Sequence, residues 1–503
     1  MGAARRARLV FGVSSFAAAS LTTVAASLAA QEPQRLTIEA YTLRSYDGRA
    51  QQIELGRLPV PESRDRVNGA TVSLAFLRLR STSPSPGSPI VFLMGGPGIP
   101  ATVMAPIPPY WDLFDRLRAV GDVILLDQRG VGLSSPKLDC PPLTRPPDSS
   151  LLSSRSALVA AFRNALASCA SLWRERGTDP RAYTDDASAD DVDDVRRALG
   201  AERVSLLGFS YGTRLALAFA RRHPDRLDRL VLQGPEDPDL RYRSSLTADS
   251  LFGQFARLAA ADSASAAFSQ DLRRRLGALL ALSSRTPFVV HVRSPGGDSV
   301  SILVGKEGLQ AMIAERVGDP RLPALVATLE RGDQRLLAQR VEAMYGGIAA
   351  GAGSLMARAV DCSALPSGAR TARVDAQSKR SILGLFFDNQ VVTRGFCDAL
   401  GEGDPADHPR GRLSLTGPAL IIVGQLDDQT PMGNAAVVAG SFSGSVRLVV
   451  ENGGHELLTA SVVRDAVVDF LSGRDVSGRH LRVDPPRFLS IEEALRPPRR
   501  PGF

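Results

Sequence analysis

The chain has 503 residues, of which 44% are hydrophobic and 22% charged, a balance that excludes disordered, collagen-like and small disulfide-stapled proteins. A globular protein of two or three domains is expected. The formal net charge of +7 comes from 60 basic and 53 acidic residues, and the basic ones are almost all arginines dispersed among acids. Because they form no concentrated basic stripe, we expect no nucleic acid partner.

Residues 1–30 have the pattern of a secretory signal peptide. Arg5, Arg6 and Arg8 precede an apolar stretch from Leu9 to Ala30 that ends in small residues. The stretch is about long enough to span a membrane, so an uncleaved anchor is the alternative. Its many Ser and Thr residues and the polar residues after it favour cleavage. We therefore predict a secreted or periplasmic protein without stable membrane insertion after cleavage.

Strand patterns follow the predicted signal peptide. From Leu36 to Arg80, apolar and polar residues alternate, which predicts antiparallel strands at one edge of a sheet. Further along, short continuous apolar runs are typical of strands buried on both faces of a parallel sheet flanked by helices. These runs are Ile90–Met94, Val123–Leu126, Val204–Leu207, Leu230–Leu232, Leu420–Val423 and Val446–Val450.

The rhythm of buried strands stops between Leu232 and Leu420, where an inserted, mainly helical cap domain is predicted. The interval contains one hairpin-like pair of strands, Phe288–Val292 and Ser299–Val304, and several amphipathic helical patterns. The helical patterns cover Ser250–Leu282, Lys306–Val317, Leu322–Arg331 and Gln334–Tyr345. The predicted order is a signal peptide (1–30), first core part (31–243), cap (244–412), second core part (413–473) and C-terminal surface extension (474–503).

A candidate nucleophile stands directly after one of the buried strands. Gly208 to Gly212 form a G-x-S-x-G sequence around Ser210, and a helical pattern from Thr213 to Arg222 follows. A tight turn from strand to helix needs small flanking residues and exposes the serine at the rim of the sheet. The sequence therefore predicts a nucleophile elbow, with a purely structural turn as the alternative.

A nucleophilic serine needs a general base, and the chain has five histidines. His455 follows the Val446–Val450 strand through a glycine-containing loop, at the carboxyl end of a late strand, where open α/β sheets build their sites. We predict that it is the base. The other four are expected to be ordinary capping, surface or packing residues: His223 after the nucleophile helix, His291 in a cap strand, His408 in a loop and His480 in the C-terminal extension.

The acid that orients the imidazole is expected directly after the Leu420–Val423 strand. Asp427 and Asp428 both stand there, and the motif position favours Asp427, with Asp428 as the rival. The chain order Ser210, Asp427, His455 is the order of the α/β-hydrolase fold. That fold, with a mainly parallel central sheet and an inserted helical cap, is the predicted architecture.

An acyl-transfer serine also needs donors for the oxyanion. The turn Gly95–Gly98 follows an early buried strand, and its glycines allow close approach of the backbone to a substrate. We predict that the amides of Gly96 and Tyr211 are the two donors, since Pro97 has no N–H. A Gly-Pro loop without a catalytic task is the alternative.

Five motifs together resemble the proline iminopeptidase and tripeptidyl aminopeptidase family of serine peptidases. They are Gly95–Gly98, Asp127–Ser134, Gly208–Thr213, Asp427–Pro431 and Gly453–His455. The resemblance implies an α/β-hydrolase with a helical cap that removes one or a few residues from a free peptide N-terminus, without metal or cofactor. Two departures are Met94, where such enzymes commonly have His, and the absence of cysteine from residues 260–267 in the early cap.

Two further expectations concern residues around the site. Asp127 and Arg129 are expected to pair within a loop that serves the fold rather than the chemistry. A substrate ammonium would need a carboxylate, for which Glu236 at the sheet edge and Glu315 in the cap are candidates, each with a solvated surface acid as the alternative.

The four cysteines are expected to be staples around the site of an exported protein rather than metal ligands or nucleophiles. Of three possible connectivities we predict the sequence-local pairs, Cys140 with Cys169 and Cys362 with Cys397.

The leading functional hypothesis is a serine aminopeptidase acting on small peptides. An esterase or amidase acting on small acyl substrates with the same triad is the nearest rival, because the fold does not fix the substrate. A non-catalytic binding protein on a hydrolase scaffold is the hypothesis of another class. The sequence does not indicate an oligomeric state.

Overall fold

The computed structural model describes residues 35–66, 69–236, 239, 243–294, 296–351, 353–385, 397–400 and 415–496. The predicted signal peptide and His408 lie outside these residues. Within the described part of the chain, no helix combines the length and the apolar character that crossing a membrane requires.

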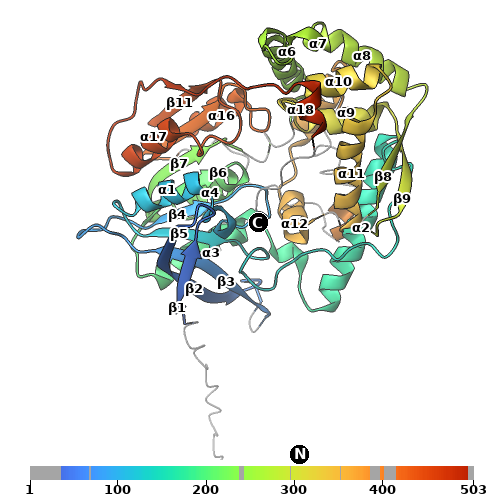
Figure 1. Ribbon diagram of the computed structural model, residues 1–503. Helices are drawn as coiled ribbons and strands as arrows, with labels where there is room; N and C mark the ends of the chain where they lie inside the picture. Colours follow the sequence, from blue (N-terminus) through green and yellow to red (C-terminus); the bar gives the residue numbers. More distant parts are fainter. Residues whose placement is uncertain are drawn as a thin grey trace, which may run out of the picture. The chain divides into compact units, whose positions relative to one another are not determined.

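A ten-stranded sheet forms the core, in the order β1-β2-β3-β5-β4-β6-β7-β10-β11-β12 (Figure 1). Antiparallel pairing joins β1, β2, β3 and β5, and parallel pairing joins all neighbours from β5 to β12. The predicted antiparallel edge and parallel centre are therefore confirmed. The strands are β1 Thr37–Arg44, β2 Ala50–Pro61, β3 Thr71–Leu79, β4 Ile90–Leu93, β5 Val123–Asp127, β6 Val204–Phe209, β7 Leu227–Gln233, β10 Ala419–Gly424, β11 Ser445–Glu451 and β12 Leu481–Arg482.

Helices cover both faces of the sheet, which is why the central strands are buried along their whole length and mostly apolar. The helices α1 (Pro108–Leu117) and α17 (Ser461–Leu471) pack on one face. The other face carries α3 (Asp185–Ala198), α4 (Tyr211–Arg222) and α16 (Met432–Ala439). Because α4 lies between the sheet and the cap, it is buried from Tyr211 to Ala220.

The inserted cap is mainly helical, as predicted, and carries the predicted hairpin of β8 (Phe288–Arg293) and β9 (Ser299–Val304). Its described helices are α6 Ser245–Ala261, α7 Ala266–Ser269, α8 Leu272–Ser283, α9 Lys306–Ala314, α10 Leu322–Glu330, α11 Arg335–Ala349, α12 Leu355–Ser363 and α13 Gly368–Ser378, followed by the 3₁₀ turn Asp398–Leu400.

Two segments from outside the predicted insertion also pack on the cap. One is α2 (Arg155–Glu175), which lies against α9, α11 and α12, preceded by a bridge from Leu152 to Val304. The other is α18 (Ile491–Leu495) near the C-terminus, which packs on α10 and α11. The predicted extension thus contributes both a sheet strand, β12, and a cap helix. The domain boundaries themselves stay a prediction.

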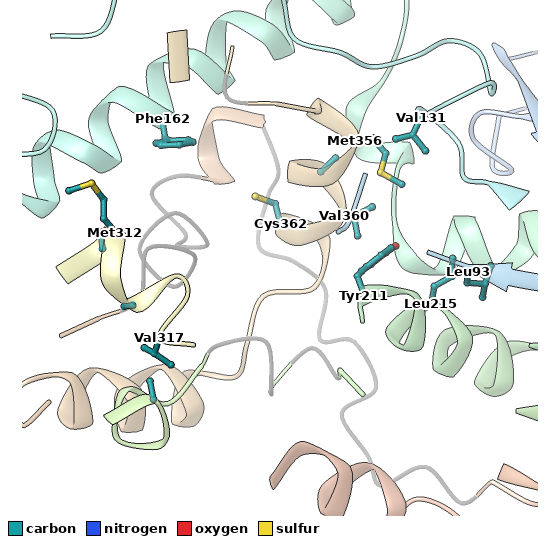
Figure 2. Close-up of a cluster of buried hydrophobic side chains, with 14 of the residues drawn as sticks. Leu93, Val131, Phe162, Tyr211, Leu215, Met312, Val317, Met356, Val360 and Cys362 are labelled. Atoms are coloured by element: carbon teal, nitrogen blue, oxygen red, sulfur yellow. The ribbon is translucent and has the colours of Figure 1, made fainter. Parts of the chain in front are cut away.

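One hydrophobic cluster runs from the nucleophile helix into the cap (Figure 2). Tyr211 on α4 points toward Val360 on α12, Leu215 lies on the side of Leu93 of β4, and the cluster continues to Met312 on α9. Both predicted disulfides are present in this part of the molecule, Cys140–Cys169 with an S–S distance of 2.08 Å and Cys362–Cys397 with 2.02 Å. They attach α2 and α12 to neighbouring chain segments.

Candidate active site

The turn between β6 and α4 places Ser210 in a strained backbone conformation, with φ 53° and ψ −124°. Neighbouring backbone packs against this turn so closely that a Cβ on Gly212 would lie 1.9 Å from the Leu93 carbonyl oxygen. A Cβ on Gly208 would lie 2.7 Å from the carbonyl oxygen of Gly212. Both glycines are therefore required by packing, as the geometry of a nucleophile elbow demands.

The structure brings the three predicted triad residues into one hydrogen-bonded line. His455 Nε2 lies 3.0 Å from Ser210 Oγ, and His455 Nδ1 lies 3.0 Å from each carboxylate oxygen of Asp427. The acid follows β10 and the histidine follows β11, so both loops leave the same edge of the parallel sheet. This arrangement allows a serine, a base and an orienting acid to act together.

The fully buried Asp427 is held by donors from its own turn. The amides of Gln429 and Thr430 donate to Oδ1 at 2.9 and 2.7 Å, and Thr430 Oγ1 donates to Oδ2 at 2.8 Å. The carboxylate of Asp428 instead accepts a hydrogen bond from the Gly318 amide of the cap at 3.0 Å. The geometry thus separates the two adjacent acids and places Asp427 against the imidazole. Thr430 was not among the site residues predicted from the sequence, although its position in the Asp427–Pro431 motif carries the signal.

The partly buried imidazole of His455 is tuned by its surroundings. Burial lowers the pKa of His455. The charge of Asp427 and the hydrogen bond to it raise this pKa by more than burial lowers it, so the net shift is upward from the usual value of 6.5. The loop that carries His455 is also held by the last residue of β7, because Gln233 Nε2 donates to the His455 carbonyl oxygen at 3.0 Å. This bond requires a polar residue at the end of β7, a role that the sequence analysis did not predict.

The predicted oxyanion turn lies against the nucleophile. A Cβ on Gly95 would come within 2.8 Å of Ser210 Cβ and 3.3 Å of its Oγ, so only glycine allows this approach. Gly96 has φ +115°, which favours glycine for a conformational reason. Tyr211 is the first residue of α4, where amides have no acceptor within the helix. The roles of the Gly96 and Tyr211 amides as oxyanion donors stay a prediction.

The predicted pair of Asp127 with Arg129 is wrong. Arg129, which is fully buried, donates to both carboxylate oxygens of Asp191 on α3, at 2.7 and 2.6 Å. Asp127 instead accepts hydrogen bonds from the amides of Thr102 and Leu133 and from Thr102 Oγ1. The acid therefore satisfies the backbone of two turns, and the arginine pairs with an acid from a different element.

The two candidates for binding the substrate amine lie in different surroundings. Glu236 is buried with an oxygen 3.9 Å from Nη1 of Arg214, a fully buried arginine of the nucleophile helix. Glu315 lines a cavity of about 540 Å³ inside the cap, together with Arg340. Neither position tests the predicted role, which stays a prediction.

The other described histidines are engaged away from the nucleophile or exposed. His223 follows the last residue of α4, and its Nε2 lies 2.9 Å from Asp190 Oδ1. His291 is hydrogen-bonded to Ser301 across the hairpin, and His480 is exposed. In the described part of the chain, no three His, Cys, Asp or Glu side chains are grouped so as to hold a metal ion.

Comparisons with known proteins match two parts of the chain. Residues 88–289 match the family described as alpha/beta hydrolase fold, and residues 381–477 match the family described as TAP-like protein. The first match contains the predicted oxyanion turn and the turn at Ser210, and the second contains Asp427 and His455.

Three curated relatives carry peptidase names. Serine protease Hip1 of Mycobacterium tuberculosis is 30% identical over 37% of this chain and 36% of its own length. The tripeptidyl aminopeptidase of Streptomyces coelicolor is 27% identical over 40% and 39%, and the probable proline iminopeptidase of Leptolyngbya boryana is 28% identical over 29% and 32%. The matches thus span only about a third of the length of these relatives.

Solved structures of α/β-hydrolase enzymes also align with the chain. An esterase from Exiguobacterium antarcticum aligns over 86% of this chain and 99% of its own, with 16% identity and a TM-score of 0.34.

Proposed function

We propose that the protein, which matches the alpha/beta hydrolase fold family over residues 88–289 and the TAP-like family over residues 381–477, is an exported serine aminopeptidase that releases one or a few residues from peptide N-termini. The observation that carries the proposal is the hydrogen-bonded line from Ser210 through His455 to Asp427 on a nucleophile elbow. The peptidase names of several relatives support a peptide substrate.

The proposed reaction proceeds through an acyl-enzyme. Ser210 Oγ attacks the scissile carbonyl carbon while His455 Nε2 takes the hydroxyl proton, and the amides of Gly96 and Tyr211 stabilise the oxyanion. The C–N bond then breaks, His455 protonates the leaving amine, and an ester to Ser210 remains. Water attacks this ester with His455 as base, which releases the acyl product and returns the proton to Ser210. Asp427 holds the imidazole in place throughout.

Labelling with a fluorophosphonate tests the serine chemistry. The wild-type protein is expected to react covalently, whereas Ser210→Ala and His455→Ala lose the label. His223→Ala is the matched control, since that histidine pairs with Asp190 instead, and it retains labelling. An unlabelled wild-type protein would contradict any serine hydrolase activity.

Peptide specificity is tested with three substrates: a tripeptide anilide with a free N-terminus, its N-acetylated twin and a simple acyl ester. The aminopeptidase proposal expects a kcat/KM for the free-amine peptide that is at least about tenfold that of the acetylated one, a difference of about 1.4 kcal/mol in transition-state stabilisation. Preference for the ester, with indifference to the amine, would identify an esterase or amidase instead.

Export rests on the N-terminal sequence pattern and on the two disulfides, which persist in oxidising compartments. Fractionation followed by N-terminal sequencing is expected to find mature protein outside the cytoplasm beginning near residue 31. Protein that stays in the cytoplasm with four alkylatable thiols would contradict export.

A further inference from the structure

A cavity of about 670 Å³ lies beside the catalytic histidine, between the core and the cap. On the core side it is lined by Asp428, His455 and Glu456, among others, and on the cap side by the chain between α9 and α10, which includes Gly318 and Asp319. A ligand in this cavity therefore contacts the same imidazole that takes part in the proposed reaction.

Asp428 brings a carboxylate with spare acceptor capacity to this cavity. Its Oδ2 accepts from the Gly318 amide at 3.0 Å, and its Oδ1 accepts only a long bond of 3.4 Å from Gln429 Nε2 among the described residues. Arg243 donates to the backbone carbonyl of Asp428 and to Gln429 Oε1, rather than to the carboxylate. Burial is the largest influence on the pKa of Asp428 and raises it. A carboxylate in this position is stabilised by a cation that enters the cavity.

The other two carboxylates that line the cavity already have partners. Asp319 forms an ion pair with Arg340 at 2.5 Å, and Glu456 Oε1 accepts a hydrogen bond of 2.6 Å from Tyr110. Within the described parts of the chain, no salt bridge joins Asp428 to any arginine or lysine. Asp428 is thus the cavity carboxylate that is available to a ligand.

The positive charges of the cavity come from the cap. Arg316 and Arg321 flank the Gly318 turn and line the cavity with it. Arg243 also acts electrostatically on the Asp428 carboxylate, but it is not among the residues that line the cavity. Because Arg316 and Arg321 repel a cation on the cap side, the favourable place for one is the core side, at Asp428 and next to His455. Glu236 and Glu315, the candidates from the sequence, do not line this cavity.

We propose that Asp428 binds the N-terminal ammonium group of the peptide substrate in the cavity beside His455. The inference rests on the proposed aminopeptidase function and names the residue that gives it specificity. The ammonium donates charge-assisted hydrogen bonds to Asp428 Oδ1, while Oδ2 stays bonded to the cap through Gly318. Recognition of the free amine then also links the substrate to the position of the cap.

Kinetics of Asp428→Asn with the free-amine and acetylated tripeptide anilides test this assignment. Asparagine keeps an oxygen acceptor for the Gly318 amide, removes the negative charge and replaces the second carboxylate oxygen by an NH2 donor. We expect KM for the free-amine peptide to rise at least tenfold, kcat at pH 8 to stay within threefold, and the acetylated peptide to be affected less than twofold. Asp319→Asn is the matched control, since its carboxylate is already paired, and it retains the preference for the free amine.

The outcomes separate the two proposals. If the wild-type enzyme does not distinguish the two peptides, the aminopeptidase function fails. If the wild type distinguishes them and Asp428→Asn does so equally well, only the assignment of Asp428 fails. Equal losses for both peptides in Asp428→Asn would also overturn it, because they would show a role in positioning the cap alone.

A crystal structure of Ser210→Ala with the free-amine peptide tests the assignment without altering Asp428. We expect the amine nitrogen within 3.2 Å of an Asp428 carboxylate oxygen, the range of a charge-assisted hydrogen bond. An amine bound at Glu236, at Glu315 or in solvent would overturn the proposal.

Discussion

Two charged regions border the triad and differ in how their charges are compensated. Behind the nucleophile, the fully buried Arg214 lies 2.9 Å from Asp185, 3.9 Å from Glu236 and 3.9 Å from Asp361. Beside the histidine, Asp428 faces a cavity and has a backbone amide as its closest donor. In the first region the buried charge is surrounded by opposite charges, and in the second it is available to a ligand.

The difference indicates separate roles for the two regions. The partners of Arg214 come from α3, from the segment after β7 and from α12 of the cap, and its guanidinium lies 4.8 Å from the Tyr211 ring centre. It therefore joins the nucleophile helix to both the core and the cap. Asp428 makes one contact with the cap and is expected to act in binding.

The largest effect on the free energy of unfolding is expected from Arg214, because its charge and those of its carboxylate partners are buried. Arg214→Met leaves buried carboxylates without their cation, which costs about 3–5 kcal/mol in free energy of unfolding. Arg222→Met on the same helix is the matched control, because Arg222 is partly exposed and its ion pairs with Asp186 and Asp190 contribute less than about 1 kcal/mol. Urea unfolding of both variants measures the difference, and equal losses would show that burial does not distinguish the two arginines.

A smaller loss is expected from the turn that holds the acid. Thr430→Val removes the hydroxyl that donates to Asp427 Oδ2 at 2.8 Å, which leaves a buried acceptor short of a donor at a cost of about 1–3 kcal/mol. In the proposed mechanism Asp427 orients the imidazole, so kcat is expected to fall about tenfold with little change in KM.

Thr459→Val is the control for Thr430→Val, since the exposed Thr459 donates only to a backbone carbonyl. Steady-state kinetics of both variants would contradict the positioning role of Thr430 if their kcat values were equal.

The pH profile reports on the negative charges that surround His455. In the proposed mechanism only the neutral imidazole of His455 can take the proton, so kcat/KM is expected to rise with pH through the pKa of His455, which is raised from its usual value of 6.5. The charge of Asp428 is among the causes that raise this pKa, after the larger contributions of Asp427. Asp428→Asn is therefore expected to shift the acid limb to lower pH. An unchanged limb would show that the Asp428 charge does not reach the imidazole.

The sequence allowed prediction of those parts of the site that are marked by residues close together in the chain. Ser210 stands between a strand and a helix with glycines at fixed offsets, and His455 follows a late strand through glycines, so both could be placed before any contact was known. Two adjacent acids follow β10; the motif position favoured Asp427, and the geometry of the turn places Asp427 against the imidazole and Asp428 against the cap.

Contacts between distant segments could not be predicted in this way. The acids around Arg214 are separated by up to 176 positions, from Asp185 to Asp361, and no periodic pattern connects them. Arg129 likewise pairs with Asp191 on α3, whereas the sequence had suggested Asp127 in its own loop as the partner. The packing of α2 and α18 on the cap has the same cause, since both are remote from the insertion in sequence.

The smallest effect is expected on the stability of Asp428→Asn, in contrast to Arg214→Met. Burial raises the pKa of Asp428 above its usual value of 3.8, so the folded state favours the protonated acid and loses stability as pH rises from the unfolded to the folded pKa. Asparagine avoids that loss and keeps a bond to Gly318, so the free energy of unfolding at pH 7 is expected to change by less than about 1 kcal/mol, toward greater stability. Below pH 3.8 the two proteins are expected to converge. A loss of several kcal/mol at pH 7 in urea unfolding would instead place Asp428 among the structural charges, with Arg214.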